Sequence, residues 1–565
     1  MKTILFALCL FVVSHASPGP SKLSIGSVQS VYQRIHNGHF QPLSKYAFPN
    51  LLGEQIQVQI QDYYNENGYL AMSGTAEGSE NSNFILKGEA DNLYGFVVMK
   101  DKNLAFEYTT NQYGDFMVQE VPVTKIYPIC DDFDGQDPQP QDEAMATHSY
   151  PIDVPHIGPY PAGQSLLKLQ SLPGAKKVIY VDISQTMNGE TPKVWTKEQV
   201  WQIWQGHAAG LSMYNVNVTT DPAVYAAAGV ANSGKLTQGN SSGTSSCCVN
   251  CFGTTSGCTI YKKDTPRYNA GTLIHEGGHL LGLNHDGAPG VEYYGGFTAY
   301  QWLPIMGSHP NALGWAEGLW QYSKGEYATA NNKEDDLSIL VKKFPFREDD
   351  ITAVVPLKIT SGSAVLGENN WGQIATNTDS DDFSFQLGTG GGKVTLKIDR
   401  IEFIGGAMLD VDATLRDGTG KIIAQSNPVK ARYAQFDTTL GAGNYTLSIK
   451  GGAEGTPANG FSNYGSMGYY GINGTIANAI VSPIQARTKG DPSIRIASVV
   501  HSLLVLDLPQ NSKVENIALY SIQGGLVFQS KTRVQAIDLS QQPKGLYLLD
   551  LEVDGQKTVK SILKP

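Results

Sequence analysis

The chain is poor in charged residues and has no basic patch. Only 16% of its 565 residues are Asp, Glu, Lys or Arg, and the formal net charge is -11. Because nucleic-acid binding needs a concentration of basic residues, we expect no nucleic-acid partner. Together with 61 glycines, the low charge is typical of β-rich extracellular modules. The length predicts several domains rather than one core.

Long apolar runs are missing beyond the N-terminus. Lys2 precedes an apolar segment at 3–13 that is too short to span a bilayer, and Ser14-His15-Ala16 has the small residues of a cleavage site. We therefore expect residues 1–16 to be a signal peptide and the protein to be secreted. No other stretch approaches the roughly 20 apolar residues of a membrane helix, so no transmembrane segment is expected.

Cysteine is scarce, with six residues in the whole chain. Cys9 belongs to the predicted signal peptide, and Cys130 stands alone. The other four lie in one loop: Cys247, Cys248, Cys251 and Cys258. In an oxidising compartment, four cysteines form two disulfides in one of three connectivities. A four-thiolate zinc site is the alternative, although the spacing lacks the paired Cys-x2-Cys arms of a zinc ribbon.

The most informative stretch begins at His275 and reads His-Glu-Gly-Gly-His-Leu-Leu-Gly-Leu-Asn-His-Asp. On a helix, His275 and His279 are spaced i and i+4, so both imidazoles project from one face. Gly282 can take a positive φ, which ends the helix and lets His285 return as a third ligand. Three imidazoles suit zinc and leave its fourth tetrahedral position for water. Glu276 is then the expected general base for that water.

The extended pattern His-Glu-x-x-His-x-x-Gly-x-x-His, followed by Asp286, resembles that of the metzincin metallopeptidases, and its His-Asp ending is most similar to the adamalysin (reprolysin-like) branch. Metzincins carry a methionine turn beneath the zinc, and Pro304-Ile305-Met306-Gly307 lies at a suitable distance downstream. The resemblance implies that Met306 forms an apolar floor under the imidazoles. Some branches place a metal-touching tyrosine two positions later, where this chain has Ser308.

Cys130 is the odd thiol of a secreted chain and lies in the segment Pro-Ile-Cys-Asp-Asp. This segment resembles the cysteine switch of metzincin zymogens, in which a propeptide thiolate fills the open position of the zinc. The alternatives are a buried unpaired cysteine, inhibition by backbone in the cleft, or a carboxylate of Asp131 or Asp132 on the metal.

Residues 17–164 are predicted to be a propeptide with a linker. Alternating segments such as those at 56–60, 84–86 and 96–99 have the period of two expected of strands, so the domain should be β-rich. From residue 131 the composition shifts to Pro, Gly, Asp and Gln, which predicts an exposed linker and a site for maturation cleavage.

Residues 165–346 are predicted to form an α/β, metzincin-like catalytic domain. Residues 178–181 are a buried-strand run, and Thr196 with Gln199 forms a capping box that opens a helix, on which His207 is expected in the core. The acidic run Glu334-Asp335-Asp336 is compatible with calcium binding. A helix start capped by Asn332 is the preferred interpretation, because carboxylates favour the first turn.

Two β-sandwich domains are expected after the catalytic domain. In the first, at 347–480, residues 375–478 alternate between apolar and polar positions with glycine-rich turns. This region resembles the bacterial pre-peptidase C-terminal domain, especially through the aspartates near Asp379 to Asp382. Residues 491–565 contain further short strands and resemble a type IX secretion sorting domain. The second resemblance implies that the chain engages a secretion machinery and is then released or attached to the cell surface.

The predicted fold is therefore multidomain, with a β-rich propeptide, an α/β metzincin-like catalytic domain and two C-terminal β-sandwich domains. The predicted function is that of a secreted zinc endopeptidase, made as a latent zymogen, with protein or peptide substrates. A catalytically silent zinc-containing adhesin, whose sandwiches bind glycan or matrix, is the main alternative. A zinc amidase or deacetylase that acts on something other than protein is another.

Overall fold

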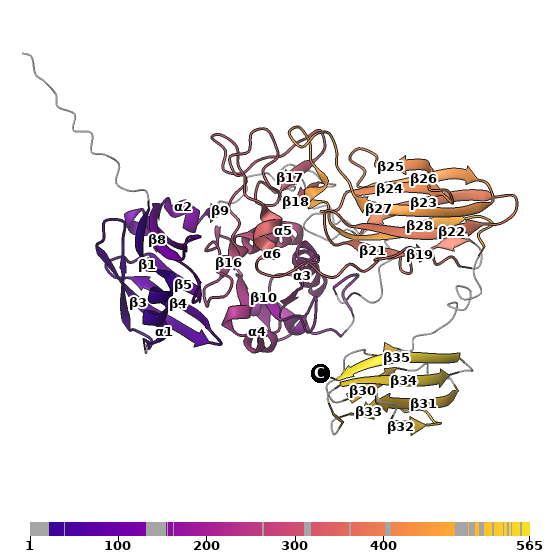
Figure 1. Ribbon diagram of the computed structural model, residues 1–565, viewed down its shortest axis with the longest axis horizontal. Coiled ribbons are helices and arrows are strands. Elements are labelled where there is room, and N and C mark those ends of the chain that lie inside the picture. The colour runs from indigo at the N-terminus through magenta and orange to yellow at the C-terminus, as the bar shows by residue number, and fades with distance from the viewer. Residues whose placement is uncertain are drawn as a thin grey trace, which may run out of the picture. The chain divides into compact units, whose positions relative to one another are not determined.

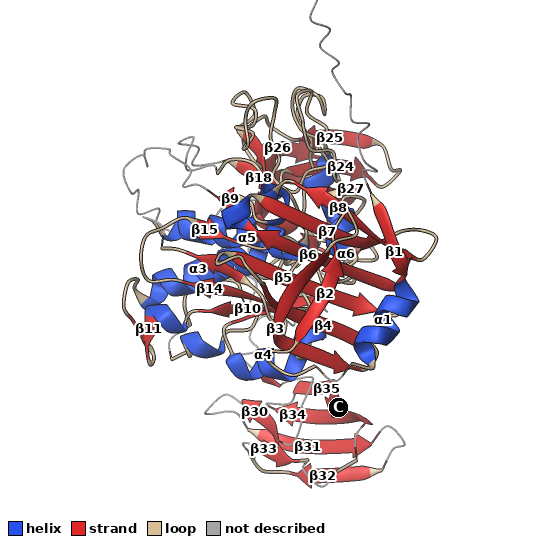
Figure 2. Cartoon of the chain, turned by 90° about the vertical axis from the view of Figure 1, so that its left-hand side faces the viewer, coloured by secondary structure: helices blue, strands red, loops and turns tan. Residues whose placement is uncertain are grey.

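The computed structural model describes residues 22–130 without 39, residues 154–480 without 155, 162, 263–264, 310–317, 361–362 and 402–407, and parts of 495–564. The predicted signal peptide and most of the predicted linker lie outside these residues. The chain divides into two compact units, Met1–Ile480 and Val481–Pro565 (Figure 1). It is a multidomain, strand-rich chain with few helices (Figure 2). No helix among the described residues combines the length and apolarity needed to cross a membrane.

The first unit begins with an eight-stranded antiparallel sheet in the order β1-β8-β7-β6-β5-β4-β3-β2. Helix α1 (Val28–His36) is capped by Ser27, and its buried residues pack with the apolar side chains of one sheet face. The strands are β1 (Leu23–Ser27), β2 (Lys45–Pro49), β3 (Gln55–Glu66), β4 (Tyr69–Ala76), β5 (Ser82–Glu89), β6 (Asn92–Met99), β7 (Leu104–Thr110) and β8 (Asp115–Val121).

The strands predicted at residues 84–86 and 96–99 are confirmed, and the middle of this sheet is covered on both faces. Phe84 and Leu86 face the core beneath α1. Ile85, Phe96 and Val98 instead belong to the core of the following region. Consecutive apolar residues are typical of strands that are buried on both sides, as β5 and β6 are here.

The central region contains a mixed sheet in the order β13-β10-β14-β16-β15-β9. The first four strands run parallel, β15 is antiparallel to β16, and β9 is antiparallel to β15. Its strands are β9 (Ile129–Cys130), β10 (Lys177–Asp182), β13 (Val216–Thr219), β14 (Ser233–Gln238), β15 (Ser245–Ser246) and β16 (Cys258–Ile260).

Helices α3 (Lys197–Gly210) and α5 (Pro266–Leu281) contact each other along their length. The predicted capping box of Thr196 and Gln199 is confirmed at the start of α3, and His207 is buried at 1% exposure. The remaining elements of the region are α2 (Val123–Ile126), α4 (Pro222–Ala228), α6 (Asp336–Val341) and the strand pairs β11 (Met187–Asn188) with β12 (Thr191–Pro192) and β17 (Trp302–Pro304) with β18 (Leu319–Gln321).

Helix α6 corrects one capping prediction. Its N-cap is Asp335, whose carboxylate accepts a hydrogen bond from the Ser338 amide at 2.9 Å, and the helix begins at Asp336. Asn332 instead accepts from the Glu334 amide in the preceding turn. The acidic run does open a helix, but the cap lies three residues later than predicted, because Asp335 reaches the first free amides directly.

Two five-stranded sheets follow, one in the order β19-β22-β27-β24-β25 and one containing β20, β28, β23 and β26 with β21 paired to β28. Alternate residues along β22, β23 and β27 are buried. The strands are β19 (Val355–Pro356), β20 (Ala364–Val365), β21 (Trp371–Ile374), β22 (Ser380–Leu387), β23 (Gly392–Arg400), β24 (Val411–Asp417), β25 (Ile422–Ser426), β26 (Tyr433–Leu440), β27 (Gly443–Gly451) and β28 (Gly468–Ile476). We call residues 355–476 the sandwich.

The second unit contains a three-stranded sheet, β29-β30-β33, and a four-stranded sheet, β32-β31-β34-β35, around its own apolar core. Its strands are β29 (Arg495–Ile496), β30 (Leu503–Asp507), β31 (Val514–Ser521), β32 (Leu526–Ser530), β33 (Ala536–Asp538), β34 (Gly545–Val553) and β35 (Gln556–Lys564).

Candidate metal centre

Helix α5 carries the His-Glu-x-x-His pattern and has a defined start and end. Thr265 caps it by accepting a hydrogen bond from the Tyr268 amide at 3.2 Å, and Pro266 occupies the first helical position. Gly282 ends the helix with a φ of 115°, and its amide donates to the carbonyls of Gly278 and His279. The predicted turn at Gly282 is therefore confirmed, and it uses the left-handed backbone that glycine adopts most easily.

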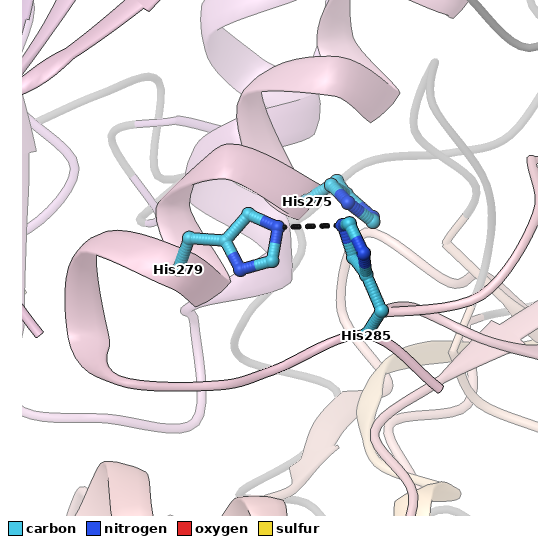
Figure 3. A group of neighbouring side chains, drawn as sticks. All are labelled: His275, His279 and His285. Carbon is cyan, nitrogen blue, oxygen red and sulfur yellow. Dashed lines mark hydrogen bonds between the residues drawn. The ribbon is translucent and has the colours of Figure 1, made fainter. Parts of the chain in front are cut away.

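The three predicted ligands converge after this turn. His275 and His279 project from α5, and His285 returns toward them from the following loop (Figure 3). Nitrogen atoms of the three rings all lie within 4.8 Å of one another. The Nε2 atoms of His279 and His285 are 2.9 Å apart. The sequence spacing and the glycine turn thus bring three imidazoles to one point.

In each of these histidines the Nδ1 atom is engaged by an acceptor, which leaves Nε2 to face the common point. His275 Nδ1 lies 2.9 Å from the Ile305 carbonyl oxygen, and His279 Nδ1 lies 2.8 Å from that of Leu283. His285 Nδ1 lies 2.7 Å from a carboxylate oxygen of Glu292. Such contacts fix the tautomer and orientation of metal-ligating histidines.

The environment keeps the rings of His275 and His279 neutral. Burial and the neighbouring His285 lower the pKa of His275 to about 3. Burial and the adjacent histidines also lower the pKa of His279 well below its usual range. A neutral imidazole can offer its lone pair to a metal, so protonation does not compete for these two rings near neutral pH.

Glu276 lies directly after the first histidine and is fully buried, at 0% exposure. Its backbone carbonyl oxygen lies 3.3 Å from the sulfur of Cys247 and 3.6 Å from that of Cys258. This turn of α5 is therefore packed against the loop of cysteines, which restrains the backbone that carries both Glu276 and His275.

Met306 packs against α5 between the two helical histidines. A Cβ atom placed on Gly278, between the two helical histidines, would collide with the Met306 sulfur. The Met306 carbonyl accepts a hydrogen bond from the Asp286 amide at 2.8 Å, and the neighbouring Ile305 carbonyl contacts His275. The turn therefore touches the helix, the first ligand and the residue after the third ligand.

The four loop cysteines form two disulfides, Cys247–Cys258 and Cys248–Cys251, so a four-thiolate zinc site in this loop is wrong. The same loop caps the end of α5. The Asn250 amide donates to the His279 carbonyl at 2.7 Å, and the Phe252 amide donates to the Leu280 carbonyl at 2.9 Å. Two of the carbonyls that a helix end leaves unpaired are satisfied in this way.

Cys130 is placed in strand β9, where it is the register partner of Ser245 on β15. Ile129 is the partner of Ser246 in the same antiparallel pair. The segment predicted to contain the cysteine switch therefore occupies the edge of the central sheet through its backbone. The Cys130 side chain, together with Asp131 and Asp132, lies outside the described residues.

The sequence did not predict Glu292 or Tyr293, which complete the wall of the site. Besides the Glu292 contact, the ring of Tyr293 lies 4.5 Å from that of His285 and 6.1 Å from that of His275, centroid to centroid. Both residues lie in an irregular loop without periodicity. The one available signal is chemical, because a ligating histidine needs a partner for its second nitrogen and an acid follows His285 by seven residues.

The acidic run that allowed a calcium interpretation makes protein contacts. Glu334 accepts from the Asn284 amide at 2.5 Å and from the Asn284 side chain at 3.0 Å, next to the third histidine. Asp335 caps α6, and Asp336 accepts from the Ser323 amide at 2.8 Å. Among the described residues, these three acids do not form one of the groups that could hold a metal.

Zinc fits the three histidines. Two nitrogens on one tetrahedral zinc lie roughly 3.3 Å apart, because each Zn–N bond is about 2.0–2.1 Å. The 2.9 Å separation of the two Nε2 atoms, and the 4.8 Å limit for all three rings, are close to this requirement. The donor set contains only imidazole nitrogen, which suits zinc better than the oxygen-seeking calcium or magnesium.

Comparison with known proteins gives little information on the first 480 residues. No curated protein matches the chain. One similar solved structure is a biofilm associated protein, BSP domain, with 10% identity and a TM-score of 0.11. That match covers 36% of this chain and 51% of the other, so it spans about half the length of that protein.

A second similar structure is the adhesin domain of Epf from Streptococcus pyogenes, with 9% identity and a TM-score of 0.10 over 34% of this chain and 74% of that chain. At these TM-scores, neither similarity defines a fold for this chain.

The C-terminal unit has a family match. Residues 500–564 match the family described as the secretion system C-terminal sorting domain, within the 491–565 region where this resemblance was predicted. The two small sheets of the second unit are formed largely by these residues. Proteins that carry such domains are exported and are often attached to the cell surface. The chain is therefore a secreted protein with a type IX secretion sorting domain at residues 500–564.

Proposed function

We propose that the chain is a secreted zinc-dependent endopeptidase, made as a latent precursor, that hydrolyses peptide bonds of extracellular proteins. One observation carries the proposal: three oriented imidazoles meet at one point beside a glutamate that is fully buried on the same helix. The support comes from the chemistry of this site, because the matched family describes only a sorting domain and the two similar structures carry no argument at their TM-scores.

His275, His279 and His285 would hold the zinc through Nε2. When bound, zinc polarises a substrate carbonyl and acidifies a water molecule. The carboxylate of Glu276 accepts the proton of the attacking water and passes it to the leaving amine. Burial of Glu276 at 0% exposure excludes bulk solvent, which favours transfer to the amine over loss of the proton.

The edge of the central sheet supports peptide binding. β15 would be the edge strand if β9 were absent, because the order at this side of the sheet is β16-β15-β9. A strand edge offers free amide and carbonyl groups that an extended substrate pairs with. In the precursor this position is filled by Ile129 and Cys130 in an antiparallel pair, which supports latency by occupation of the substrate edge.

The test is the pair of substitutions Glu276→Gln and His285→Ala, in activated enzyme with casein as substrate. Glu276→Gln keeps the size of the side chain and removes the base, so we expect a 10² to 10⁴-fold loss of turnover with zinc still bound. His285→Ala removes a ligand, so we expect loss of the zinc itself. Casein hydrolysis by Glu276→Gln at the parent rate would refute the mechanism. Unchanged zinc content in His285→Ala would refute the ligand set.

The catalytically silent adhesin is the second candidate. The two strand-rich regions around the site and the adhesion-related names of the similar structures are what favour it. The same experiment separates the candidates. An adhesin would leave casein intact after activation, and its binding to matrix or glycan would be equal in the parent and in Glu276→Gln. A zinc amidase or deacetylase would leave casein intact but lose its own activity in Glu276→Gln.

A further inference from the structure

The sandwich contacts the loop that forms one wall of the metal centre. We call residues 287–301 the wall loop, because it starts just after His285 and contains Glu292 and Tyr293, which both contact that histidine. The part of the sandwich that meets it is residues 452–462, which follow β27, and we call this segment the clamp loop. Contacts between these two loops connect the metal centre to the sandwich.

Arg432 joins the clamp loop to the wall loop with the two ends of one guanidinium. It lies just before β26, and its side chain is 0% exposed. Its Nη1 forms an ion pair with a carboxylate oxygen of Glu454 in the clamp loop at 3.1 Å. Its Nη2 donates to the carbonyl oxygens of Tyr300 and Gln301, the second at 3.4 Å. The planar fork of arginine presents donors on separate nitrogens, whereas a lysine amine presents all of them on one atom.

The surroundings of Arg432 fix it in an unfavourable backbone conformation. Its φ is 56°, in the left-handed region that non-glycine residues rarely adopt. A carboxylate oxygen of the buried Asp410 lies 3.6 Å from its Nη1, and the centre of the Phe461 ring lies 5.6 Å from its guanidinium carbon. Burial raises the pKa of Asp410 to about 6, so this carboxyl is still mostly ionised at pH 7.5. Strained residues that neighbouring contacts hold in place are concentrated at functional sites.

Aromatic packing joins the same two loops independently of the ion pair. Phe461 of the clamp loop is buried and stacks on Trp302, the residue that follows the wall loop, with ring centres 6.2 Å apart and planes 10° apart. A Cβ atom on Gly455 would lie 2.8 Å from the Tyr300 hydroxyl oxygen, so the backbone of the clamp loop touches the Tyr300 ring directly. The end of the wall loop is therefore held through side chains as well as through its carbonyls.

The start of the wall loop is linked to the clamp loop through Tyr327. The Tyr327 hydroxyl donates to the Gly287 carbonyl at 2.8 Å, and its ring stacks on that of Tyr294 with centres 4.0 Å apart. The next residue, Ala328, donates its amide hydrogen to the carbonyl of Ala458 in the clamp loop at 3.1 Å. The sandwich therefore reaches both ends of the wall loop.

We infer that the sandwich positions the wall of the metal centre, with Arg432 as the positioning residue. The inference rests on the proposed zinc site and assigns the sandwich a part in its activity. Because the Glu292 carboxylate orients the ring of His285, a displaced wall loop would leave the third ligand less well oriented. Tyr293 would move with the same loop. The sandwich then belongs to the catalytic unit, and an enzyme that lost it would bind zinc more weakly.

The first test measures amide hydrogen exchange of the wall loop by mass spectrometry, in the full-length precursor without added metal. Arg432→Lys keeps the positive charge beside Glu454 but cannot also span to Tyr300. We expect its wall-loop peptides to exchange at least about fivefold faster, because local opening depends on the contacts that hold a segment. Arg416→Lys is the matched control, since Arg416 donates to the Gly420 carbonyl within the sandwich, and it should exchange like the parent.

Gly455→Ala is a second variant, which changes no charge and replaces Arg432→Lys if that protein does not fold. Its methyl group would press on the Tyr300 ring from the clamp loop. Gly420→Ala is its control, because Gly420 has a similar left-handed φ, 85° against 70°, and no atom within 4 Å of the added carbon. Only the contact with Tyr300 differs, so we expect faster wall-loop exchange in Gly455→Ala alone. The inference is overturned if Arg432→Lys and Gly455→Ala both exchange like their controls.

A second readout tests the effect on the metal centre. Cobalt(II) can replace zinc on the same ligands, and its visible absorption depends on the coordination geometry. Titration of the zinc-free precursor with CoCl₂ should give a Kd about three- to tenfold higher in Arg432→Lys and Gly455→Ala than in their controls, with altered visible bands. A role confined to the stability of the sandwich would leave the Kd and the bands unchanged, and that result would overturn the inference even if exchange were faster.

Failure of the proposed function would look different from failure of this inference. In that case the parent itself would bind no cobalt, or would leave casein intact after activation. The exchange measurement uses neither metal nor casein, so it would still decide whether the sandwich holds the wall loop.

Discussion

Glu292 provides a sharp test of the metal centre, because it touches the third histidine and was not predicted as part of the site. We expect Glu292→Gln to lower zinc affinity. The glutamine keeps the length of the side chain but replaces the carboxylate that lies 2.7 Å from His285 Nδ1. His285 would then lose a negatively charged acceptor that orients its ring and raises its basicity as a ligand.

The size of the expected loss in zinc affinity follows from how exposed the side chains of Glu292 and His285 are. Loss of such an outer partner typically costs 10- to 100-fold in metal affinity. The Glu292 side chain is 57% exposed, whereas that of His285 is 7% exposed. Water therefore screens the charge and partly replaces the lost acceptor, so the lower end of the range is expected: about tenfold, or roughly 1.4 kcal/mol.

The assay is competition for zinc between the protein and a chromophoric chelator at pH 7.5. Glu368→Gln, an exposed glutamate in the sandwich, serves as the control and should bind zinc like the parent. Casein hydrolysis by Glu292→Gln should be restored by excess zinc, since Glu276 is untouched. An unchanged zinc affinity would show that Glu292 does not support the site. A loss of zinc affinity above about 10³-fold would exceed what an outer partner contributes and would indicate that Glu292 is itself a ligand.

Two further predictions concern latency and pH. In a precursor with an intact linker, both Cys130→Ala and Ile129→Pro should raise basal casein hydrolysis, the first by freeing the metal and the second by breaking the β9 pairing with the sheet edge. If only Ile129→Pro activates, the backbone alone causes latency and the cysteine switch is refuted. Burial lowers the pKa of Lys343 to about 8, so between pH 8 and about 10.5 the unfolded chain holds a proton that the folded chain has released. The free energy of unfolding should therefore rise with pH, by at most about 1 kcal/mol per pH unit for this partly buried group. The free energy of unfolding, measured by chemical denaturation, should rise less between pH 7.5 and 9.5 in Lys343→Met than in the parent or in the control Lys342→Met. An equal rise in all three proteins would contradict the argument.

The local features of helices α3 and α5 could be predicted because each depends on a few neighbouring residues. The i, i+4 spacing of His275 and His279, the left-handed turn at Gly282 and the capping box at Thr196 need no long-range information. The pairing of the loop cysteines needed the fold, because four cysteines close together allow three connectivities.

The features that sequence patterns missed are long-range. Glu292 approaches His285 through an irregular loop, and no periodicity marks it. The second covered face of the N-terminal sheet was missed because residues 96–99 were interpreted as alternating, although four consecutive apolar residues indicate a strand that is buried on both sides. The cap of α6 was misplaced because Asp335 and Asn332 are equally good capping residues, and only the geometry chooses between them.

The N-terminal sheet and the central region share one apolar core, and this core affects how proteolytic cleavage of the linker can be detected. Ile85, Phe96 and Val98 remain buried whether or not the linker is intact, and each buried side chain contributes about 1.5–3 kcal/mol to holding the two parts together. The Lys87 amine adds contacts to the Asn250 and Phe252 carbonyls, in the loop that caps the end of α5. A nick in the linker would thus convert one chain into a two-chain complex without dissociation. A denaturing gel would then display two fragments while the site stayed closed, and only a native separation, or digestion of the N-terminal sheet, would distinguish a cut precursor from a released enzyme.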